Sequence, residues 1–235
     1  IAGLLSVAIA IPPYLRRRAS TFDLVELEGF PGFRRRAGTS VQSNAVLFVG
    51  LEGQPTKDKR WDSGSLCDVL FGDEGWRSDP LTVAVFSDYY CPYCAILDQR
   101  LDKMRKAGLP IRLSFHELPL LGSRSRWAAQ VALAAGRQMP HDQIHLDLMQ
   151  RGVKPGLAGL RDVATRHGLD LRKLQEDALG AEIRQEIEAG LALGRTLGIV
   201  GTPGTFIGRT LLLGALSEAD IDAMVTLERE EPFSG

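Results

Sequence analysis

The sequence predicts an α/β fold in which a βαβ half and a ββα half flank an all-helical insertion. Three observations lead to this prediction. "LTVAVFS", starting at Leu81, is a compact apolar run of strand length, and a helical pattern and the alternating strand "PIRLSFHEL" follow it. Residues 123 to 198 carry helical patterns and almost nothing strand-like. The chain then returns to two short strand candidates, "GTPGTFIG" and "TLLLG", and ends in a helix.

The elements of the first half are set by apolar spacing. The predicted helix has its apolar positions at Ile96, Leu97, Leu101 and Met104 and stops at Gly108. In "PIRLSFHEL" apolar and polar residues alternate, which is typical of a strand that buries one face. Strand, helix and strand in this order begin a βαβ unit.

The insertion is predicted to hold several helices, and the second half to end in a capped one. Helical segments are "SRSRWAAQVALAAG", "HDQIHLDLMQ", "GLRDVATRHG" and the long "LRKLQEDALGAEIRQEIEAGLALGRTLG". The two short strands are separated by a turn near Arg209. The last helix, "SEADIDAMVTLERE", has Ser217 as its expected N-cap, with Asp220 placed to complement the helix N-terminus.

Residues 1–19 are predicted to be the remnant of a signal peptide or membrane anchor. The stretch "IAGLLSVAIAIPPYL" is apolar but shorter than the ~20 residues that usually cross a bilayer. The alternative is a short helix packed on the domain. Export would place the protein in an oxidising compartment, so we expect a periplasmic location in a bacterium, with an anchor in the inner membrane as an option.

Residues 20–75 are predicted to form an N-terminal extension with short strands and one short helix. The helix is expected in "SGSLCDVLFGDEG", ended by Gly72. Two arginine runs, at residues 16–18 and 34–36, are interpreted as solvated faces. Residues 76–235 then form the main domain, with the insertion at about 123–198. No role is predicted for the extension.

Charge and cysteine content exclude several classes of protein. Among 235 residues, 28 basic and 29 acidic side chains leave a net charge of -1, so no global field recruits nucleic acid or an anionic membrane. Three cysteines are too few for a small disulfide-stapled domain. A working pair, Cys91 and Cys94, with Cys67 as a buried spare thiol is the simplest interpretation.

The pair Cys91 and Cys94 has the spacing that disulfide exchange requires. Such exchange needs a reactive thiolate, a second thiol nearby and access for a partner chain. At a helix N-terminus, Cys91 is expected at the first exposed position, where unpaired N–H groups and the helix dipole lower a thiol pKa, with Cys94 one turn inside. Pro92 suits the first helical position.

Two other uses of the pair stay open at this point. "CPYC" is half of a four-ligand zinc site if His141 and His145, spaced i, i+4, complete it, although the gap to them is longer than in zinc fingers. A structural disulfide is the second alternative. Its loop of two residues would constrain the unfolded chain very little.

Four stretches together resemble one known family. They are "VAVFSDYYCPYC", "FHELPLLGSRSRWAAQVALAA", the helix ending "GRTLGIVGTPGTFIG", and the helical insertion. Over about residues 78 to 230 the sequence resembles the DsbA-like family of bacterial thiol-disulfide oxidoreductases, in the thioredoxin superfamily. The resemblance implies a thioredoxin-like fold with a helical insertion.

The resemblance also implies roles for individual residues. Cys91 would be the attacking thiol, Cys94 the resolving thiol, and Pro203 a cis-proline that faces the pair and, with Thr202, contacts substrate. An X-Pro bond tolerates cis far better than other peptide bonds, and a strand starting there offers backbone groups to an extended peptide. The alternative for Pro203 is a trans turn residue. His116 stands where many relatives have lysine.

Neighbours of the pair are further candidates. Asp88 and Glu117 could lie near the sulfurs and relay a proton, with a cap or surface role as the alternative. Tyr93, together with Tyr89 and Tyr90, could form a partly apolar rim for substrate, although such aromatic residues are more often core.

The sequence thus predicts an enzyme that exchanges disulfides with exported proteins, with the oxidase direction favoured over reductase or isomerase. Its expected partners are thiol- or disulfide-bearing exported proteins and a redox protein that regenerates the pair. No cofactor is expected besides the redox-active disulfide Cys91–Cys94, and no resident metal or nucleic acid. The alternative of another class is a copper or zinc carrier that holds the metal on the thiolates. Glutathione-conjugating relatives lack such a pair.

Overall fold

A computed structural model of the chain describes residues 22–38, 63–72 and 75–231. Its strands are β1 (Leu24–Glu26), β2 (Arg34–Arg36), β3 (Leu81–Ser87), β4 (Ile111–Glu117), β5 (Gly204–Ile207) and β6 (Thr210–Leu213). Its helices are α1 (Ser63–Phe71), α2 (Pro92–Lys106), α3 (Ser123–Gly136), α4 (His141–Arg151), α5 (Gly156–His167), α6 (Leu171–Ala178), α7 (Ala181–Thr196) and α8 (Glu218–Glu230). The strands form one mixed sheet in the order β1-β2-β6-β5-β3-β4.

Strand β3 lies inside the sheet and carries the chain toward the cysteines. It pairs in parallel with β4 and antiparallel with β5, and all seven of its residues are buried. A strand covered on both faces is expected to be apolar throughout, as "LTVAVFS" is. Phe86 pairs with Gly204, so the end of β3 that precedes Cys91 lies beside the start of β5 that follows Pro203.

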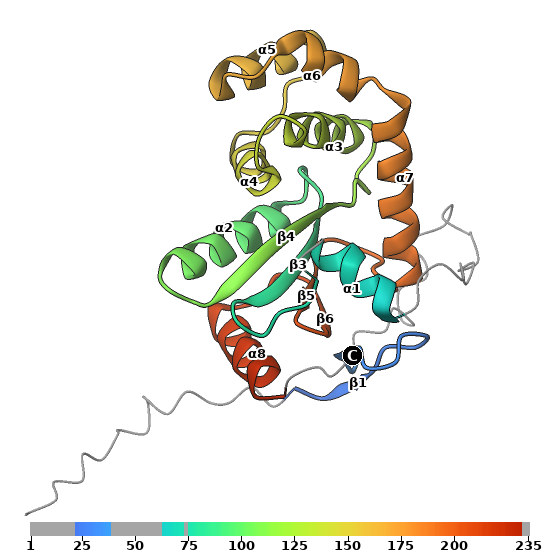
Figure 1. Cartoon of the computed structure of the whole chain (residues 1–235), viewed down its shortest axis with the longest axis vertical. Coiled ribbons are helices and arrows are strands. Elements are labelled where there is room, and N and C mark those ends of the chain that lie inside the picture. Colours follow the sequence, from blue (N-terminus) through green and yellow to red (C-terminus); the bar gives the residue numbers. More distant parts are fainter. Residues whose placement is uncertain (1–21, 39–62, 73–74, 232–235) are drawn as a thin grey trace, which may run out of the picture.

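Helices cover both faces of the sheet. Figure 1 shows α2 and α8 on one side of the sheet and α1 and α7 on the other. Buried residues of α2 and α8 pack with one set of strand residues, among them Leu97 and Met224. Leu66 of α1 packs with Phe86 and Phe206 from the opposite face. The alternation predicted for β4 is confirmed, because every second residue of this strand is buried.

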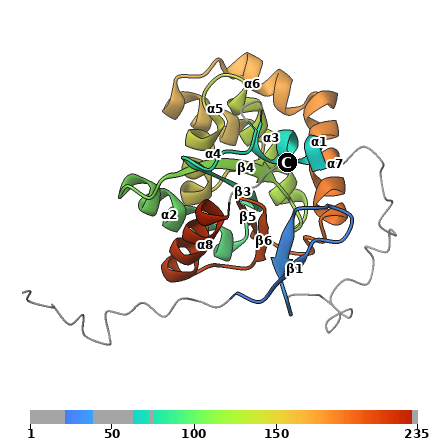
Figure 2. The same cartoon turned by 60° about the horizontal axis from the view of Figure 1, so that its bottom comes forward.

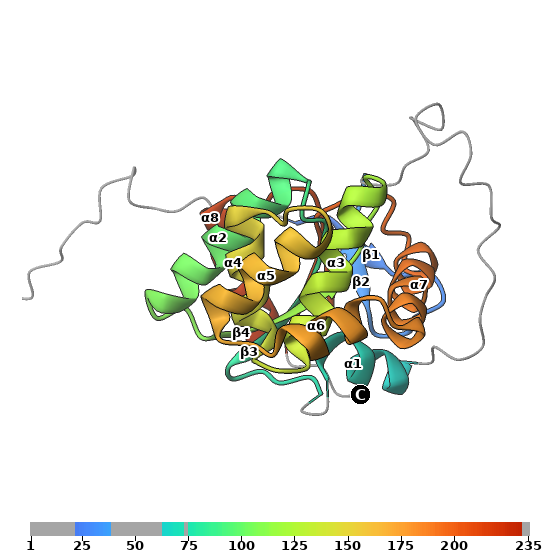
Figure 3. The same ribbon diagram turned by 90° about the horizontal axis from the view of Figure 1, so that it is seen from above.

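The helical insertion is confirmed, with one correction. Helices α3 to α6 lie together above one end of the sheet, as Figures 1 and 3 show. The long helix predicted over residues 171–198 is instead two helices, α6 and α7. Gly180 has an extended backbone (ψ 156°) and is the N-cap of α7. Glycine has a low helix propensity, which favours a break here over a continuous helix.

The N-terminal extension adds a small hairpin to the sheet. Strand β1 pairs antiparallel with β2, and β2 pairs in parallel with β6, on the side of the molecule that Figure 2 brings forward. Arg34 does not lie on a solvated face, as the sequence suggested: its guanidinium contacts the buried carboxylate of Glu228 at 2.8 Å. The opposite charge 194 residues away is invisible to local sequence patterns.

Other local predictions are confirmed. Helix α1 ends before Gly72, and α2 ends before Gly108. Ser217 and Asp220 form a full capping box at the start of α8. The predicted anchor remnant at residues 1–19 and the strand candidates within residues 39–62 lie outside the described residues.

Candidate active site

The loop after β3 places Cys91 at the N-terminus of α2. Cys91 is the N-cap residue, Pro92 occupies the first turn, and the amide of Cys94 donates to the carbonyl of Cys91 at 3.1 Å. The amide of Cys91 in turn donates to the carbonyl of Asp88 at 3.0 Å, which closes the loop. The predicted strand-to-helix setting of the pair is therefore present, and both cysteines are thiols in this structure.

Cys91 is the more accessible cysteine of the pair, although less so than the sequence predicted. It is 6% exposed, against 0% for Cys94. The expected exposed position is wrong because the loop before β5 lies against it: the Cys91 thiol donates to the carbonyl of Thr202 at 3.3 Å. A small remaining exposure still distinguishes Cys91 from the fully buried Cys94.

The Cys94 thiol is held protonated by its surroundings. Burial raises its pKa well above the usual range, since water cannot reach a thiolate there to solvate it. The neighbouring Cys91 adds to the rise, and hydrogen bonds with the Asp88 backbone and with Thr202 oppose it without cancelling it. Cys94 is therefore a protonated thiol near neutral pH.

The peptide bond between Thr202 and Pro203 is cis, as the resemblance implied. Pro203 is buried, and its carbonyl accepts a hydrogen bond from the amide of Gly214 at 2.8 Å. A Cβ atom at Gly204 would come 2.7 Å from the side chain of Ile199, so glycine allows the backbone to approach closely here. These contacts fix the loop that carries Thr202 over the pair.

Asp88 organises the loop that leads into the pair. Its carboxylate accepts from the amide of Tyr90 at 2.8 Å and from the amide of Leu121 at 2.9 Å. Since both oxygens bind backbone donors, the carboxylate has a capping role, which was the alternative for this residue. Asp88 interacts with Cys94 through its backbone and not through its carboxylate.

The three tyrosines of "DYYCPYC" separate into two groups. Tyr93 is 62% exposed and Tyr90 is 38% exposed, and Leu121, whose amide donates to Asp88, is exposed as well. Tyr90 and Tyr93 thus offer exposed aromatic surface on either side of Cys91 in the chain. Tyr89 is instead buried, and its hydroxyl donates to Glu117 at 2.7 Å, so it is wrong as a rim residue.

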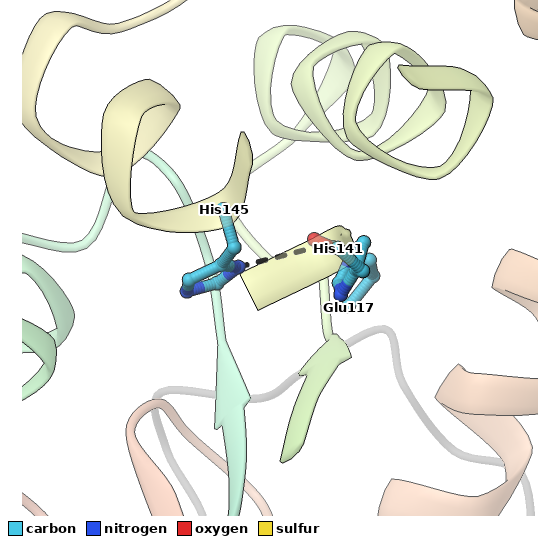
Figure 4. A group of neighbouring side chains, drawn as sticks. All are labelled: Glu117, His141 and His145. Atoms are coloured by element: carbon cyan, nitrogen blue, oxygen red, sulfur yellow. Dashed lines mark ion pairs between the residues drawn. The ribbon is translucent and has the colours of Figure 1, made fainter. Parts of the chain in front are cut away.

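Glu117 belongs to a buried polar cluster behind α2, together with Tyr89, Asp98, His141 and His145. His145 Nε2 lies 3.1 Å from Asp98 Oδ2, and His145 Nδ1 lies 2.9 Å from the Tyr89 hydroxyl. Figure 4 shows how His141 and His145 of α4 lie beside Glu117 at the end of β4. Among the interactions described, none joins the Glu117 carboxylate to a sulfur.

Opposite charges outweigh burial in this cluster. Burial alone would raise the pKa of Glu117, but hydrogen bonds with His141 and His145 bring it to about 2. Burial alone would lower the pKa of His145, but the carboxylates of Asp98 and Glu117 raise it to about 9. Burial and these same carboxylates raise the pKa of Tyr89. The cluster is thus a set of mutually stabilising charges.

Sequence analysis missed Asp98 and the pairing of His145. Two spacings could have indicated them: Asp98 follows Cys94 by one helical turn, and His141 and His145 are one turn apart on α4. The spacing does not show that α2 and α4 are in contact, which only the folded chain reveals.

His116 and Cys67 have structural surroundings. His116 Nε2 lies 2.9 Å from the carbonyl of Leu70, its ring stacks on Phe86, and burial lowers its pKa. It therefore joins β4 to α1. Cys67 is half-buried against the core, and burial raises the pKa of its thiol.

The zinc site proposed from the sequence does not form with the cysteines. Among the described residues, the group whose side chains are close enough to share a metal ion is Glu117, His141 and His145. The two histidines thus lie with a carboxylate and away from the pair.

Comparison with protein families decides the identity of the fold. The family described as the DSBA-like thioredoxin domain matches residues 82–225. The chain belongs to the DsbA-like thioredoxin family. It has the thioredoxin-like fold of that family.

Solved structures agree with this assignment. A thioredoxin-like oxidoreductase from Silicibacter pomeroyi is 32% identical, with a TM-score of 0.58, covering 69% of this chain and 97% of that one. A periplasmic thioredoxin-like protein from Salmonella enterica serovar Typhimurium is 30% identical, with a TM-score of 0.57, covering 69% and 95%.

A curated relative is much longer than this chain. The "Na(+)/H(+) antiporter NhaA 1" of Salinispora arenicola is 29% identical over 157 residues, which are 65% of this chain and 24% of the antiporter. The chain thus spans about a quarter of the length of that relative. Within the described part of this DsbA-like protein, none of the helices has the length and apolar character to cross a membrane.

Proposed function

We propose that this DsbA-like protein exchanges disulfides with exported proteins through Cys91 and Cys94, with Cys91 as the attacked and attacking sulfur. The observation that carries the proposal is the asymmetry of the pair at the α2 N-terminus: Cys91 keeps an opening to solvent and Cys94 has none. Only the accessible sulfur can meet a partner chain. The raised pKa of Cys94 supports its role as the waiting thiol.

The exchange starts from the oxidised pair, which serves in place of a cofactor. A substrate thiolate attacks Cys91 Sγ, the Cys91–Cys94 bond breaks, and a mixed disulfide forms while Cys94 leaves with the electron pair and then takes up a proton. A second substrate thiolate attacks the substrate sulfur of the mixed disulfide, and Cys91 leaves. The substrate gains a disulfide, and the pair is reduced by two electrons.

Side chains around Cys91 would receive the substrate. Tyr90 and Tyr93 offer exposed aromatic surface next to Cys91 in the chain, and Thr202 offers backbone before the start of β5, where the cis Pro203 holds it in place. An extended peptide can bind such a backbone edge with little sequence preference. This suits an enzyme with many unfolded substrates.

The proposed direction is oxidation of substrates, followed by reoxidation of the pair by a partner redox protein. Titration in glutathione buffers tests it. At a potential of about −200 mV, near that of an oxidising compartment, an oxidase pair should be mostly reduced, because its own potential is higher. A pair that stays mostly oxidised in this buffer would instead identify a reductase.

Trapping tests the roles of the two sulfurs. The Cys94→Ser variant, mixed with a peptide that contains one disulfide, should accumulate a Cys91–peptide adduct because no second thiol resolves it. Mass spectrometry of the intact protein detects the added peptide mass. Cys91→Ser should give no adduct, and Cys67→Ser is the matched control for the third thiol. An adduct formed by Cys91→Ser at the wild-type rate would reverse the assignment.

We also propose that the protein acts on the periplasmic side of the inner membrane, tethered through residues 1–19. Three observations support this: the apolar stretch in these residues, the similarity to a periplasmic protein, and the similarity of 157 residues to part of a membrane antiporter. Fractionation of cells that express the chain tests the tether. The chain should sediment with membranes, and a version without residues 1–19 should not. Equal sedimentation of both would refute the tether and leave the redox proposal intact.

A further inference from the structure

Three side chains of the buried cluster have the arrangement of a metal site. Glu117 ends strand β4, and His141 and His145 project from the same face of α4, one turn apart. One ligand atom from each lies within 4.8 Å of the other two. His141 Nε2 is 3.2 Å and His145 Nδ1 is 3.7 Å from Glu117 Oε1, as Figure 4 illustrates. Ligand atoms about 2.0–2.1 Å from a tetrahedral zinc ion would be separated by roughly 3.3 Å.

Asp98 orients one of these ligands from behind. Its carboxylate lies 3.1 Å from His145 Nε2, and both side chains are fully buried. When Nε2–H donates to a carboxylate, a neutral ring presents the lone pair of Nδ1, which here lies 2.9 Å from the Tyr89 hydroxyl and 3.7 Å from Glu117 Oε1, so the hydroxyl would move aside when an ion binds. A carboxylate behind a metal-binding histidine is the common outer contact in zinc sites, because it fixes the ring and makes it more basic.

A second observation points to a missing ligand. The Glu117 side chain is 3% exposed, and among the described residues its Oε2 has no hydrogen-bond partner. His141 Nε2 pairs with the other carboxylate oxygen, Oε1, at 3.2 Å, so Oε2 is the atom left over. Buried polar atoms are almost always satisfied, so a buried carboxylate oxygen without a partner, beside two imidazoles, indicates a group that binds there.

The donor set selects the ion. Two imidazoles and one carboxylate suit Zn²⁺, which binds three protein ligands with a fourth position left for water or another group. The His141 side chain is 27% exposed, so an ion can enter from solvent on that side. The Tyr89 hydroxyl, 2.7 Å from Glu117 Oε1, borders the remaining position.

We propose that Glu117, His141 and His145 bind one Zn²⁺ ion, with Asp98 as a positioning residue. The site is separate from Cys91 and Cys94 and adds to the redox function. It would join α4 of the insertion to the end of β4. Asp98 lies on α2 and Tyr89 in the loop before Cys91, so the ion would sit next to the elements that hold the redox pair.

Zinc binding by the full chain tests the proposal. The pair is first oxidised, because a disulfide does not compete for zinc, and Cys67→Ser removes the third thiol. Equilibrium dialysis against Zn²⁺ should then give one ion per chain. Co²⁺ in place of zinc should give visible bands of a tetrahedral ion without a thiolate charge-transfer band.

Matched variants assign the ligands. His141→Ala, at a half-buried position, should weaken Zn²⁺ binding by 100-fold or more, and Asp98→Asn by about 10- to 100-fold. His167→Ala is the control, since His167 also lies near a carboxylate, Asp147 Oδ2 at 3.0 Å, but outside the site. Circular dichroism checks that each variant folds. No uptake of zinc, or uptake that His141→Ala leaves unchanged, would overturn the proposal and leave the cluster as a set of internal ion pairs.

Discussion

Two regions of the molecule bury a carboxylate completely, and they differ in what lies opposite it. Asp98 of α2 faces the imidazole of His145. Glu228 of α8 faces the guanidinium groups of Arg34 and Arg209, at 2.8 and 3.6 Å. An imidazole can give up its proton or bind a metal, whereas a guanidinium keeps its charge at every accessible pH.

The comparison suggests a division of labour. The Arg–Glu cluster has fixed charges and joins the N-terminal hairpin to the last helix, which is a structural task. The cluster of Asp98 and His145 contains groups whose protonation and ligands can change, and it lies next to the elements that carry Cys91 and Cys94. The two carboxylates are equally buried, but the residue paired with each one determines whether its role is structural or whether its protonation and ligands can change.

The largest effect is expected from removing Glu228. Glu228→Ala should lower the free energy of unfolding by about 3–5 kcal/mol, because Arg34 and Arg209 would lose their buried partner. Urea denaturation measures the loss. Glu231→Ala is the control, since Glu231 contacts the same arginines from the surface and should cost about 0–1 kcal/mol. Disulfide exchange by the folded Glu228→Ala protein should stay at the wild-type rate. An equal loss of unfolding free energy in Glu228→Ala and Glu231→Ala would contradict the special role of the buried carboxylate.

Removing the charge of Asp98 should have a smaller effect. Asp98→Asn keeps the shape and one acceptor oxygen, so we expect a loss of about 1–3 kcal/mol in the metal-free protein. The loss is limited because His145 can remain neutral beside an amide. Asp102→Asn, on the same helix and paired with Arg105 and Lys106 near the surface, is the reference in the same urea measurement. A loss of unfolding free energy larger than that of Glu228→Ala would mean that His145 does not become neutral beside the amide.

The smallest effect concerns Asp147, a half-buried carboxylate on the same helix as His145. Asp147 of α4 contacts His167 and Arg166, and although partial burial raises its pKa, these partners lower it below the usual value of 3.8. A carboxylate with a depressed pKa stabilises the fold above its unfolded-state pKa, and this stability is lost as the pH falls through the folded-state pKa. The difference in unfolding free energy between wild type and Asp147→Asn should therefore be constant above about pH 5 and shrink below pH 4. A difference that grows with acid would contradict the assigned partners.

Local patterns predicted most of the fold and the position of the redox pair. The apolar run of β3, the helix start at Pro92 and the cap at Ser217 depend on neighbouring residues, so the sequence alone was sufficient. The break at Gly180 was missed because the apolar spacing continues across it.

Contacts between distant elements were not predictable. Glu117, Asp98 and His145 come from three separate segments, and their charges meet only when β4, α2 and α4 pack. Arg34 seemed solvated because its partner is near the other end of the chain. The covering of Cys91 by Thr202 likewise requires the register between β3 and β5.

The hairpin of β1 and β2 has a consequence for how this domain can be trimmed. A version reduced to the family-matched residues 82–225 would lose both Arg34 and Glu228. Strand β6, now paired with Arg34 and Arg35, would then become an edge strand with free backbone donors and acceptors. Such an edge invites pairing with another molecule, so the short version should self-associate where the longer chain is protected.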